Sequence, residues 1–270
     1  MIFSILLFFV FIPLLLLFEK SYKFKLLIIY STFVLFHGFT VFWIYELNKE
    51  SGIAIFLINS LFFLIPFVIY KYVLKKFNYF MAALLFIVSW LSLEFFHHNW
   101  GFAFPYMTLG NGLATAPNFI QWYEYTGVLG GSLWVLLINL FLFDIVKQVL
   151  NKNKIKKLKI VGVSCLILIP ISISFLLRTG NLNKEKPIEV VSVHTNADCY
   201  NFKYKVSNKK LVNHYLDATL PNITKNTSFI IWPETAIKRG TWIEENKVKE
   251  NSLLKYIKDT IKLKSSKANI

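Results

Sequence analysis

The chain has 270 residues, of which 55% are hydrophobic and 17% are aromatic, and its mean hydropathy is +0.50. Soluble domains contain about 45–50% apolar residues, so this composition excludes an ordinary soluble protein and favours a polytopic membrane protein. The formal net charge is +15. No basic patch is interleaved with aromatic residues, so we expect no nucleic-acid partner.

Six apolar runs of membrane-spanning length occupy the first two thirds of the chain. An apolar run of roughly 17–25 residues can cross the hydrocarbon core, and its backbone must satisfy its own hydrogen bonds there, which predicts a helix for each run. The six runs are Ile2–Phe18, Leu26–Tyr45, Ile53–Tyr70, Phe80–Phe96, Gly127–Val146 and Ile160–Leu177.

The loops between these runs alternate in charge. Lysines gather in Glu19–Lys25, Lys71–Tyr79 and Lys147–Lys159, whereas His97–Thr126 contains no Lys or Arg. The positive-inside rule therefore assigns the three basic loops to the cytoplasm. We expect the intervening loops, and everything after Arg178, to lie on the outer side of the membrane.

The outer loop 97–126 is rich in aromatic residues and is repeatedly broken by Gly and Pro. We expect it to be interfacial or re-entrant, the alternative being an aromatic belt that only anchors helix ends. Glu94 and Asp144 are the acidic residues nearest membrane depth, and both lie near helix ends, so we expect them to be exposed at the interface. His97 and His98 lack a third ligand at metal spacing, so no metal site is predicted.

Residues 179–187 are polar and predict a linker, after which the hydrophobic pattern changes. Strand and helix patterns then alternate, which is typical of the opening of an α/β domain. The predicted elements are a strand at Ile188–Val193, a helix at Lys205–Leu220, a strand at Phe229–Trp232 and a helix at Asn246–Lys264. Because sheets usually contain about five or six strands, we expect residues 188–270 to be an incomplete domain.

The second predicted strand leads directly into Pro233 and Glu234. A carboxylate at the tip of a buried strand is held rigidly near apolar walls, where a general base with a raised pKa can be built. Glu234 is therefore the candidate catalytic residue. The alternative is a surface glutamate that follows a strand by chance.

Three stretches carry a resemblance to a known family. Phe102–Asn139 looks like an outer loop with a Phe-Pro-aromatic step and a Leu-Gly turn, leading into a glycine-containing membrane helix. Val190–Tyr204 looks like a first nitrilase strand and loop, although His194 replaces the usual glutamine of Gln-x-Asn. Ile230–Ile237 looks like the strand that ends in a catalytic glutamate. In this order the stretches resemble the apolipoprotein N-acyltransferase family of bacterial inner-membrane enzymes.

The resemblance implies a fold and a location. The fold is a polytopic α-helical membrane domain of about six spans over residues 1–178, followed by an incomplete α/β nitrilase-like domain (an αββα sandwich) over residues 188–270. The location is the bacterial cytoplasmic membrane, with the C-terminal domain on the periplasmic side.

The resemblance also implies a reaction. A Glu-Lys-Cys triad takes an acyl chain from a phospholipid onto the cysteine as a thioester. The triad then passes the chain to the N-terminal amine of a diacylated apolipoprotein. The implied partners are the phospholipid donor, the apolipoprotein acceptor and the membrane, and no cofactor or metal is implied.

Carried over residue by residue, the family's general base matches Glu234. The family's outer loop matches Pro105, Tyr106 and Leu109, and the asparagine of Gln-x-Asn matches Asn196, which makes these four the candidate substrate-binding residues. Two other residues fail as triad members, because Lys238 follows the strand end too closely and Cys199 precedes the glutamate in the wrong loop. We therefore expect an acyltransferase that is cut at both ends and has no acyl-transfer activity alone.

Two other functions remain open at this point. The first is a non-catalytic remnant that binds lipid or lipoprotein without turnover. The second is a small membrane transporter with an outer cap, which would need polar residues along a pathway through the spans. The spans contain few such residues and no paired charges. The oligomeric state has no signature in the sequence.

Overall fold

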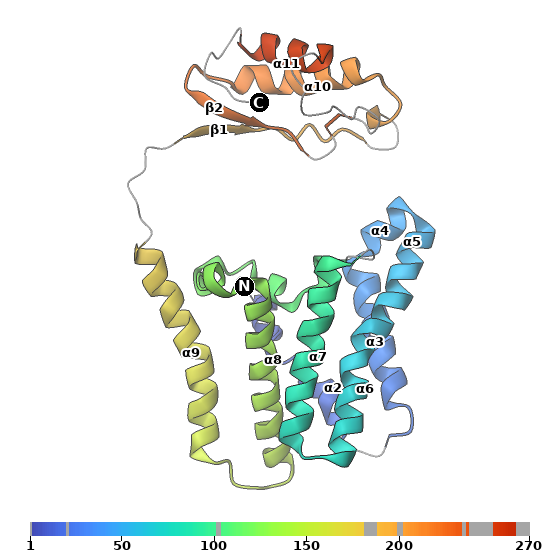
Figure 1. The fold of residues 1–270 in the computed structure, drawn as a ribbon, viewed down its shortest axis with the longest axis vertical. Coiled ribbons are helices and arrows are strands. Elements are labelled where there is room, and N and C mark those ends of the chain that lie inside the picture. Colours follow the sequence, from blue (N-terminus) through green and yellow to red (C-terminus); the bar gives the residue numbers. More distant parts are fainter. Residues whose placement is uncertain are drawn as a thin grey trace. The chain divides into compact units, whose positions relative to one another are not determined.

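A computed structural model of the chain describes residues 2–19, 22–100, 104–180, 188–198, 202–233, 236–237 and 251–262. The chain divides into two compact units, Met1–Asn183 and Lys184–Ile270 (Figure 1). The predicted base Glu234 lies outside the described residues, as do Cys199 and Lys238.

The first unit is a bundle of apolar helices. Within the described residues, four helical stretches are long and apolar enough to cross a membrane. They are the continuous stretch of α5 (Lys49–Ala54), η1 (Ile55–Asn59) and α6 (Ser60–Lys76), then α7 (Tyr79–Asn99), α8 (Tyr123–Leu150) and α9 (Lys157–Gly180). The prediction of a helical membrane domain is confirmed, whereas the predicted number of about six spans is not.

The first predicted span, Ile2–Phe18, is not one helix. It consists of two five-residue helices, α1 (Ile2–Leu6) and α2 (Ile12–Leu16), joined by turns. Pro13 lies in the first turn of α2, where its missing N–H is tolerated, and its ring prevents the helix from continuing back through that point. The predicted single helix is therefore wrong for this segment.

Asn139 of α8 pairs with backbone groups at the break between α1 and α2. Its Oδ1 accepts a hydrogen bond of 2.9 Å from the Phe11 N–H, and its Nδ2 donates to the Leu7 carbonyl at 2.7 Å. Asn139 is fully buried. Because unpaired backbone groups are costly at membrane depth, this carboxamide allows the chain to bend there.

The second predicted span, Leu26–Tyr45, is also interrupted. Helix α3 (Lys25–Thr40) ends where Val41 leaves the helical conformation, and α4 (Phe42–Leu47) follows as a short separate helix. The Thr40 hydroxyl donates to the Phe36 carbonyl at 2.7 Å, a local bond of the kind that competes with continued helix. Helix α3 is apolar but shorter than the four spanning stretches.

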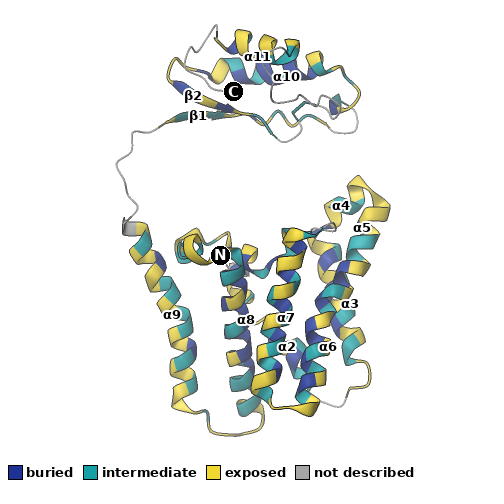
Figure 2. Cartoon of the chain, in the orientation of Figure 1, coloured by how far each residue is buried: buried dark blue, intermediate teal, exposed yellow. Residues whose placement is uncertain are grey.

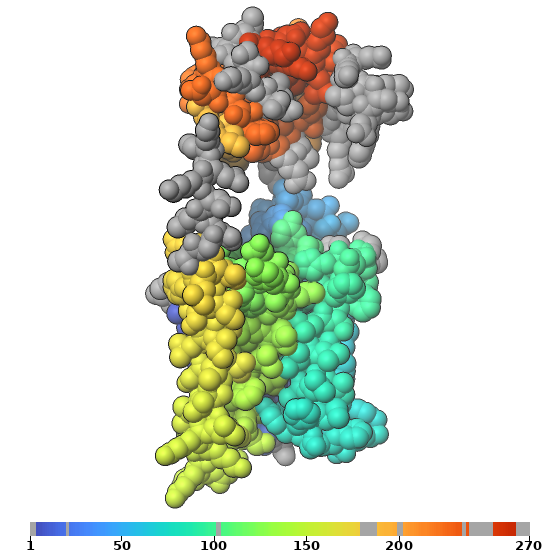
Figure 3. All heavy atoms as spheres, turned by 60° about the vertical axis from the view of Figure 1, so that its left-hand side comes forward, coloured from blue at the N-terminus to red at the C-terminus, as the bar shows by residue number. Residues whose placement is uncertain are grey.

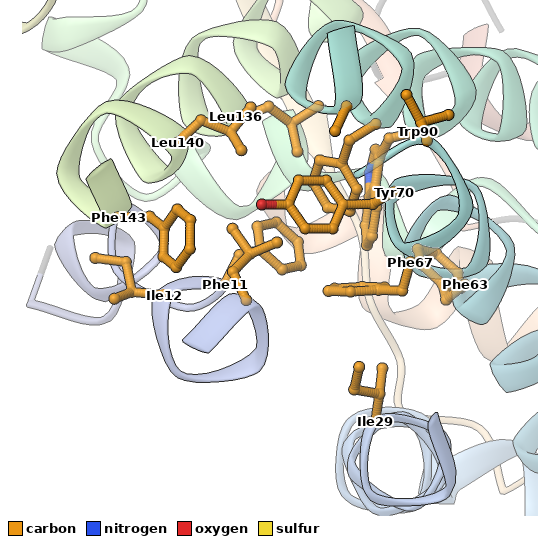
Figure 4. Close-up of a cluster of buried hydrophobic side chains, with 14 of the residues drawn as sticks. Phe11, Ile12, Ile29, Phe63, Phe67, Tyr70, Trp90, Leu136, Leu140 and Phe143 are labelled. Atoms are coloured by element: carbon orange, nitrogen blue, oxygen red, sulfur yellow. The ribbon is translucent and has the colours of Figure 1, made fainter. Parts of the chain in front are cut away.

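Aromatic side chains form the core of the first unit (Figure 4). Phe11 from the segment before α2 lies edge-on to Trp90 of α7, with ring centroids 4.7 Å apart. Phe67 of α6 lies edge-on to Phe86 of α7 at 5.1 Å. Such aromatic pairs add van der Waals packing between helices, which is what holds bundles together where lipid is as apolar as the core.

The outward faces of the helices are exposed, as Figure 2 shows for α6, α7 and α9. Many of the exposed side chains on these helices are large and hydrophobic. Helix α9 lies beside α8 at the edge of the bundle (Figure 3). The Trp134 indole of α8 donates to the Leu166 carbonyl of α9 at 2.6 Å. Only a small share of α9 is buried within the chain. Apolar surface of this kind is expected of residues that face lipid.

The described residues of the second unit form two parallel strands and two α-helices. Strand β1 (Glu189–Ser192) pairs with β2 (Thr227–Ile231), so that Val190 lies opposite Phe229. Helix α10 (Asn208–Thr219) connects the strands and α11 (Ser252–Lys262) follows, as the sequence predicts. Parallel pairing requires such a crossover. The αββα nitrilase fold itself stays a prediction.

We expect Asn139→Ala to destabilise the helical unit by about 2–4 kcal/mol, because the Phe11 N–H and the Leu7 carbonyl both lose a buried partner. The free energy of unfolding in mixed micelles measures this. Ser89→Ala is the matched control, since Ser89 bonds only to the Phe86 carbonyl on its own helix. Equal stability of the two variants would show that Asn139 does not support the break.

Candidate functional site

The outer loop after α7 folds into three short 3₁₀ helices over its described part. These are η2 (Pro105–Met107), η3 (Leu109–Leu113) and η4 (Pro117–Phe119). A proline begins η2 and η4, where the fixed backbone angle of proline favours a helical start. The loop then enters α8, which is kinked at Gly127, whose φ of +64° suits a glycine.

Glu94 ties this loop to α7. Its Oε1 accepts hydrogen bonds from the Trp90 indole on its own helix and from the backbone N–H of Leu109 in η3, both at 2.9 Å. Glu94 is only 2% exposed, so the prediction that it lies exposed at the interface is wrong. The loop folds back over the end of α7 and covers it, which helix position alone does not reveal. Asp144, in contrast, is partly exposed and pairs with Lys159.

Gly110 fixes the loop against α8. Its N–H donates to the Ser132 hydroxyl at 2.9 Å, and its carbonyl accepts from the Tyr123 hydroxyl at 3.1 Å. A Cβ at Gly110 would lie 2.1 Å from the Val128 carbonyl oxygen, so only glycine fits this close approach. We call the Leu109–Gly110 step, with its partners on α7 and α8, the loop clamp.

The structure brings together three of the predicted substrate-binding residues. Pro105 and Tyr106 lie in η2, immediately before the loop clamp, and Leu109 is part of it. The Tyr106 side chain is 62% exposed, and its ring lies 6.0 Å from the ring of Trp43 in α4. Tyr106 is therefore the member of this set most open to a ligand, while Leu109 packs against the aromatic core.

Asn196, the fourth predicted substrate-binding residue, belongs to the second unit. It follows β1 and adopts a left-handed φ of 49°, a conformation that asparagine tolerates better than most residues. At the start of the same strand, Glu189 accepts hydrogen bonds from the hydroxyls of Thr224 and Thr227, and these bonds hold the pKa of its carboxyl below the usual range.

Several largely apolar cavities open among the described helices of the first unit, and two of them are candidates for ligand binding. One has a volume of about 370 Å³ beside η1, and its lining includes Asn59, His97 and Phe104. The other has a volume of about 320 Å³ and no polar surface, and its lining includes Leu113 and Trp134. Cavities with such walls can hold hydrocarbon chains but offer few groups for chemistry.

The strand end before Glu234 is held firmly. Trp232 donates from its indole to the Thr219 hydroxyl at 3.0 Å, and its ring stacks on Tyr215 with centroids 5.2 Å apart. Both partners belong to α10. The described chain is thus fixed up to Pro233, next to the predicted base. Among the described residues, no three His, Cys, Asp or Glu side chains gather closely enough to hold a metal ion.

Sequence reasoning missed the partners of the loop clamp. Trp90 and Ser132 looked like ordinary span residues, and Tyr123 looked like an interfacial aromatic residue. Glu94 could have pointed to these partners, because a carboxylate within a membrane helix needs hydrogen-bond donors. Trp90 lies one helical turn earlier and carries such a donor.

We expect Glu94→Leu to cost about 1–3 kcal/mol of stability and to loosen the outer loop, because two N–H donors lose their acceptor. Glu94→Gln should cost less, since an amide oxygen can replace Oε1. Limited proteolysis of the loop and the free energy of unfolding measure the two effects. Glu124→Gln, at an exposed carboxylate in the first turn of α8, is the control. A Leu variant as stable as this control would rule out the clamp.

The chain was compared with known proteins. Residues 1–141 match the family model described as the apolipoprotein N-acyltransferase N-terminal domain. Over 225 residues the chain is 24% identical to an apolipoprotein N-acyltransferase from Chlorobaculum tepidum, an alignment that covers 81% of this chain and 41% of that protein. The chain thus spans about two fifths of the length of this relative.

Proposed function

The chain belongs to the apolipoprotein N-acyltransferase family, and from this premise we propose that it serves lipoprotein maturation as a phospholipid:apolipoprotein N-acyltransferase. The observation that carries the proposal is the match of residues 1–141, just over half of the chain, to the N-terminal domain of that family. The similarity to the Chlorobaculum tepidum relative extends over 81% of the chain and supports the same assignment.

The proposed reaction has two steps. A cysteine thiol gives its proton to Glu234 as its sulfur attacks an ester carbonyl of a phospholipid, and the departing lysophospholipid oxygen takes up a proton. The neutral amine of the diacylated apolipoprotein then attacks the thioester and gives a proton to Glu234, the carbon–sulfur bond breaks to leave an amide, and the departing thiolate takes that proton back. A lysine stabilises the oxyanion in both steps. Of these three groups, only the glutamate matches a residue of this sequence.

Features of the helical unit support a lipid substrate. The cavity beside η1 and the cavity lined by Leu113 and Trp134 have the walls that acyl chains require. We propose that Pro105, Tyr106 and Leu109 contact the phospholipid at the outer interface, where the exposed Tyr106 ring offers both an apolar face and a hydroxyl. In the nitrilase-like domain, Asn196 is proposed separately as a substrate-binding residue.

We further propose that residues 1–178 lie in the bacterial cytoplasmic membrane, that 179–187 form a linker, and that 188–270 form part of a nitrilase-like domain on the periplasmic side. The lysine-rich loops support this orientation. Both substrates would then be reached from the outer leaflet.

A periplasm-active reporter fused after Ile270 is expected to be active, because three basic loops place the preceding segment outside. The same reporter fused within Lys147–Lys159 is the inward control. Activity only in the second fusion would reverse the orientation.

The 270-residue chain is expected not to rescue a bacterial strain depleted of lipoprotein N-acylation, because the matching lysine and cysteine are not among its residues. Rescue would contradict this and would favour a different set of catalytic groups. A version extended by a segment that supplies both residues is the positive control.

In that extended version, Glu234→Ala should abolish the acyl-enzyme, which is seen as a mass increase on the cysteine. Normal levels of acyl-enzyme would remove Glu234 from the mechanism.

A further inference from the structure

Three buried polar side chains form a hydrogen-bonded row that connects three helices of the helical unit. His37 of α3, Asn59 at the end of η1 and His97 of α7 are each at most 5% exposed. The Asn59 Nδ2 lies 2.8 Å from the His37 Nε2, and the Asn59 Oδ1 lies 2.7 Å from the His97 Nε2. We call these three residues the His–Asn–His array.

The outer nitrogen of each imidazole faces hydrogen-bond acceptors. The His37 Nδ1 lies 2.7 Å from the Phe33 carbonyl and 3.0 Å from the Ser60 hydroxyl, which donates its own hydrogen to a carbonyl one turn earlier. The His97 Nδ1 lies 2.9 Å from the Leu93 carbonyl. A carbonyl oxygen can only accept, so both Nδ1 atoms must carry hydrogen.

The array therefore contains a mismatch when both rings are neutral. A neutral imidazole has one N–H, so with both Nδ1 atoms protonated the two Nε2 atoms are both acceptors. The Asn59 carboxamide presents one donor end and one acceptor end between them. One Nε2 is satisfied and the other faces an oxygen at hydrogen-bond distance. Exchanging the amide O and N moves the mismatch to the other histidine without removing it.

We propose that the His–Asn–His array is a proton-binding site, which holds one proton more than two neutral imidazoles so that every link becomes a hydrogen bond. The proton sits on the Nε2 that faces the Asn59 amide oxygen, so the orientation of the amide decides which ring carries the charge. Burial disfavours a charged imidazolium because the ring loses its hydration. The hydrogen-bond acceptors around the array favour the charged ring and offset part of this desolvation cost. The bound proton links α3, η1 and α7.

The titratable residues of α7 that neighbour His97 in the sequence are His98 and Glu94. His98, the next residue of α7, lies near the array, but its Nε2 donates to the Thr108 hydroxyl, which itself donates to a carbonyl. Glu94, one turn before His98, is engaged by its own two donors. Among the described residues of α3 and η1, His37 is the only histidine, and neither helix has an acidic residue.

The π-helical geometry of η1 helps to build the site. A π-helical turn is wider than an α-helical turn, and such turns occur frequently at functional sites. It spans Ile55–Asn59 and ends at the residue whose amide joins the two imidazoles. Asn59 and His97 also line the cavity of about 370 Å³. This proposal stands independently of acyl transfer.

The test is the pH dependence of unfolding of the full chain in mixed micelles between pH 6.5 and 8.5. Unfolded histidine has a pKa of about 6.5, so any proton that the array still holds above that pH is bound by the native state alone. Its contribution to stability is complete below about pH 6.5 and falls as pH rises. The site then raises the unfolding equilibrium constant tenfold per pH unit while the native proton remains bound.

His37→Gln and His97→Gln are expected to lose this tenfold-per-unit dependence, because a glutamine amide can satisfy either link without a charge. His98→Gln, next in the chain but outside the array, should keep it. Should the Gln variants fail to fold, ring ¹⁵N NMR of the unmodified chain at pH 7.5 replaces them, and we expect one imidazolium shared by His37 and His97. Equal pH slopes in all four proteins, or two neutral rings by NMR, would overturn the proposal.

Discussion

The helical unit depends on one constraint, which is that every backbone polar group at membrane depth must find a partner. Straight helices meet it by themselves, but this chain departs from straight helices between α1 and α2. There the Asn139 carboxamide supplies both the missing acceptor and the missing donor. A single buried side chain on α8 thus permits a bend that an apolar residue at the same position would not.

The same constraint explains the outer loop. Its 3₁₀ turns leave some backbone N–H groups without a backbone acceptor. Two of these, at Leu109 and Gly110, instead donate to the side chains of Glu94 and Ser132. The loop is therefore held by side chains of α7 and α8 rather than by its own hydrogen bonds alone. This is the kind of rigid support that contact residues such as Tyr106 need if they are to meet a lipid in one orientation.

The second unit is stabilised differently. Water can hydrogen-bond to its exposed backbone groups, so its stability must come from a hydrophobic core. Helices α10 and α11 bury Val212, Leu216 and Ile257 in one cluster with β2. The stacking of Trp232 on Tyr215 extends this packing to the end of β2. The approach to Glu234 is thus fixed by aromatic contact, whereas the loop clamp is fixed by hydrogen bonds.

The sequence by itself determined the membrane class, the order of strands and helices after Arg178 and the family, because these depend on composition, periodicity and motifs along the chain. Only the tertiary structure decided that Ile2–Phe18 bends, that Glu94 is buried and that His37 and His97 meet through Asn59. Such outcomes depend on partners far away in the sequence. The hydrogen bonds from Leu109 to Glu94 and from Phe11 to Asn139 join segments that are 15 and 128 residues apart, so no local pattern encodes them.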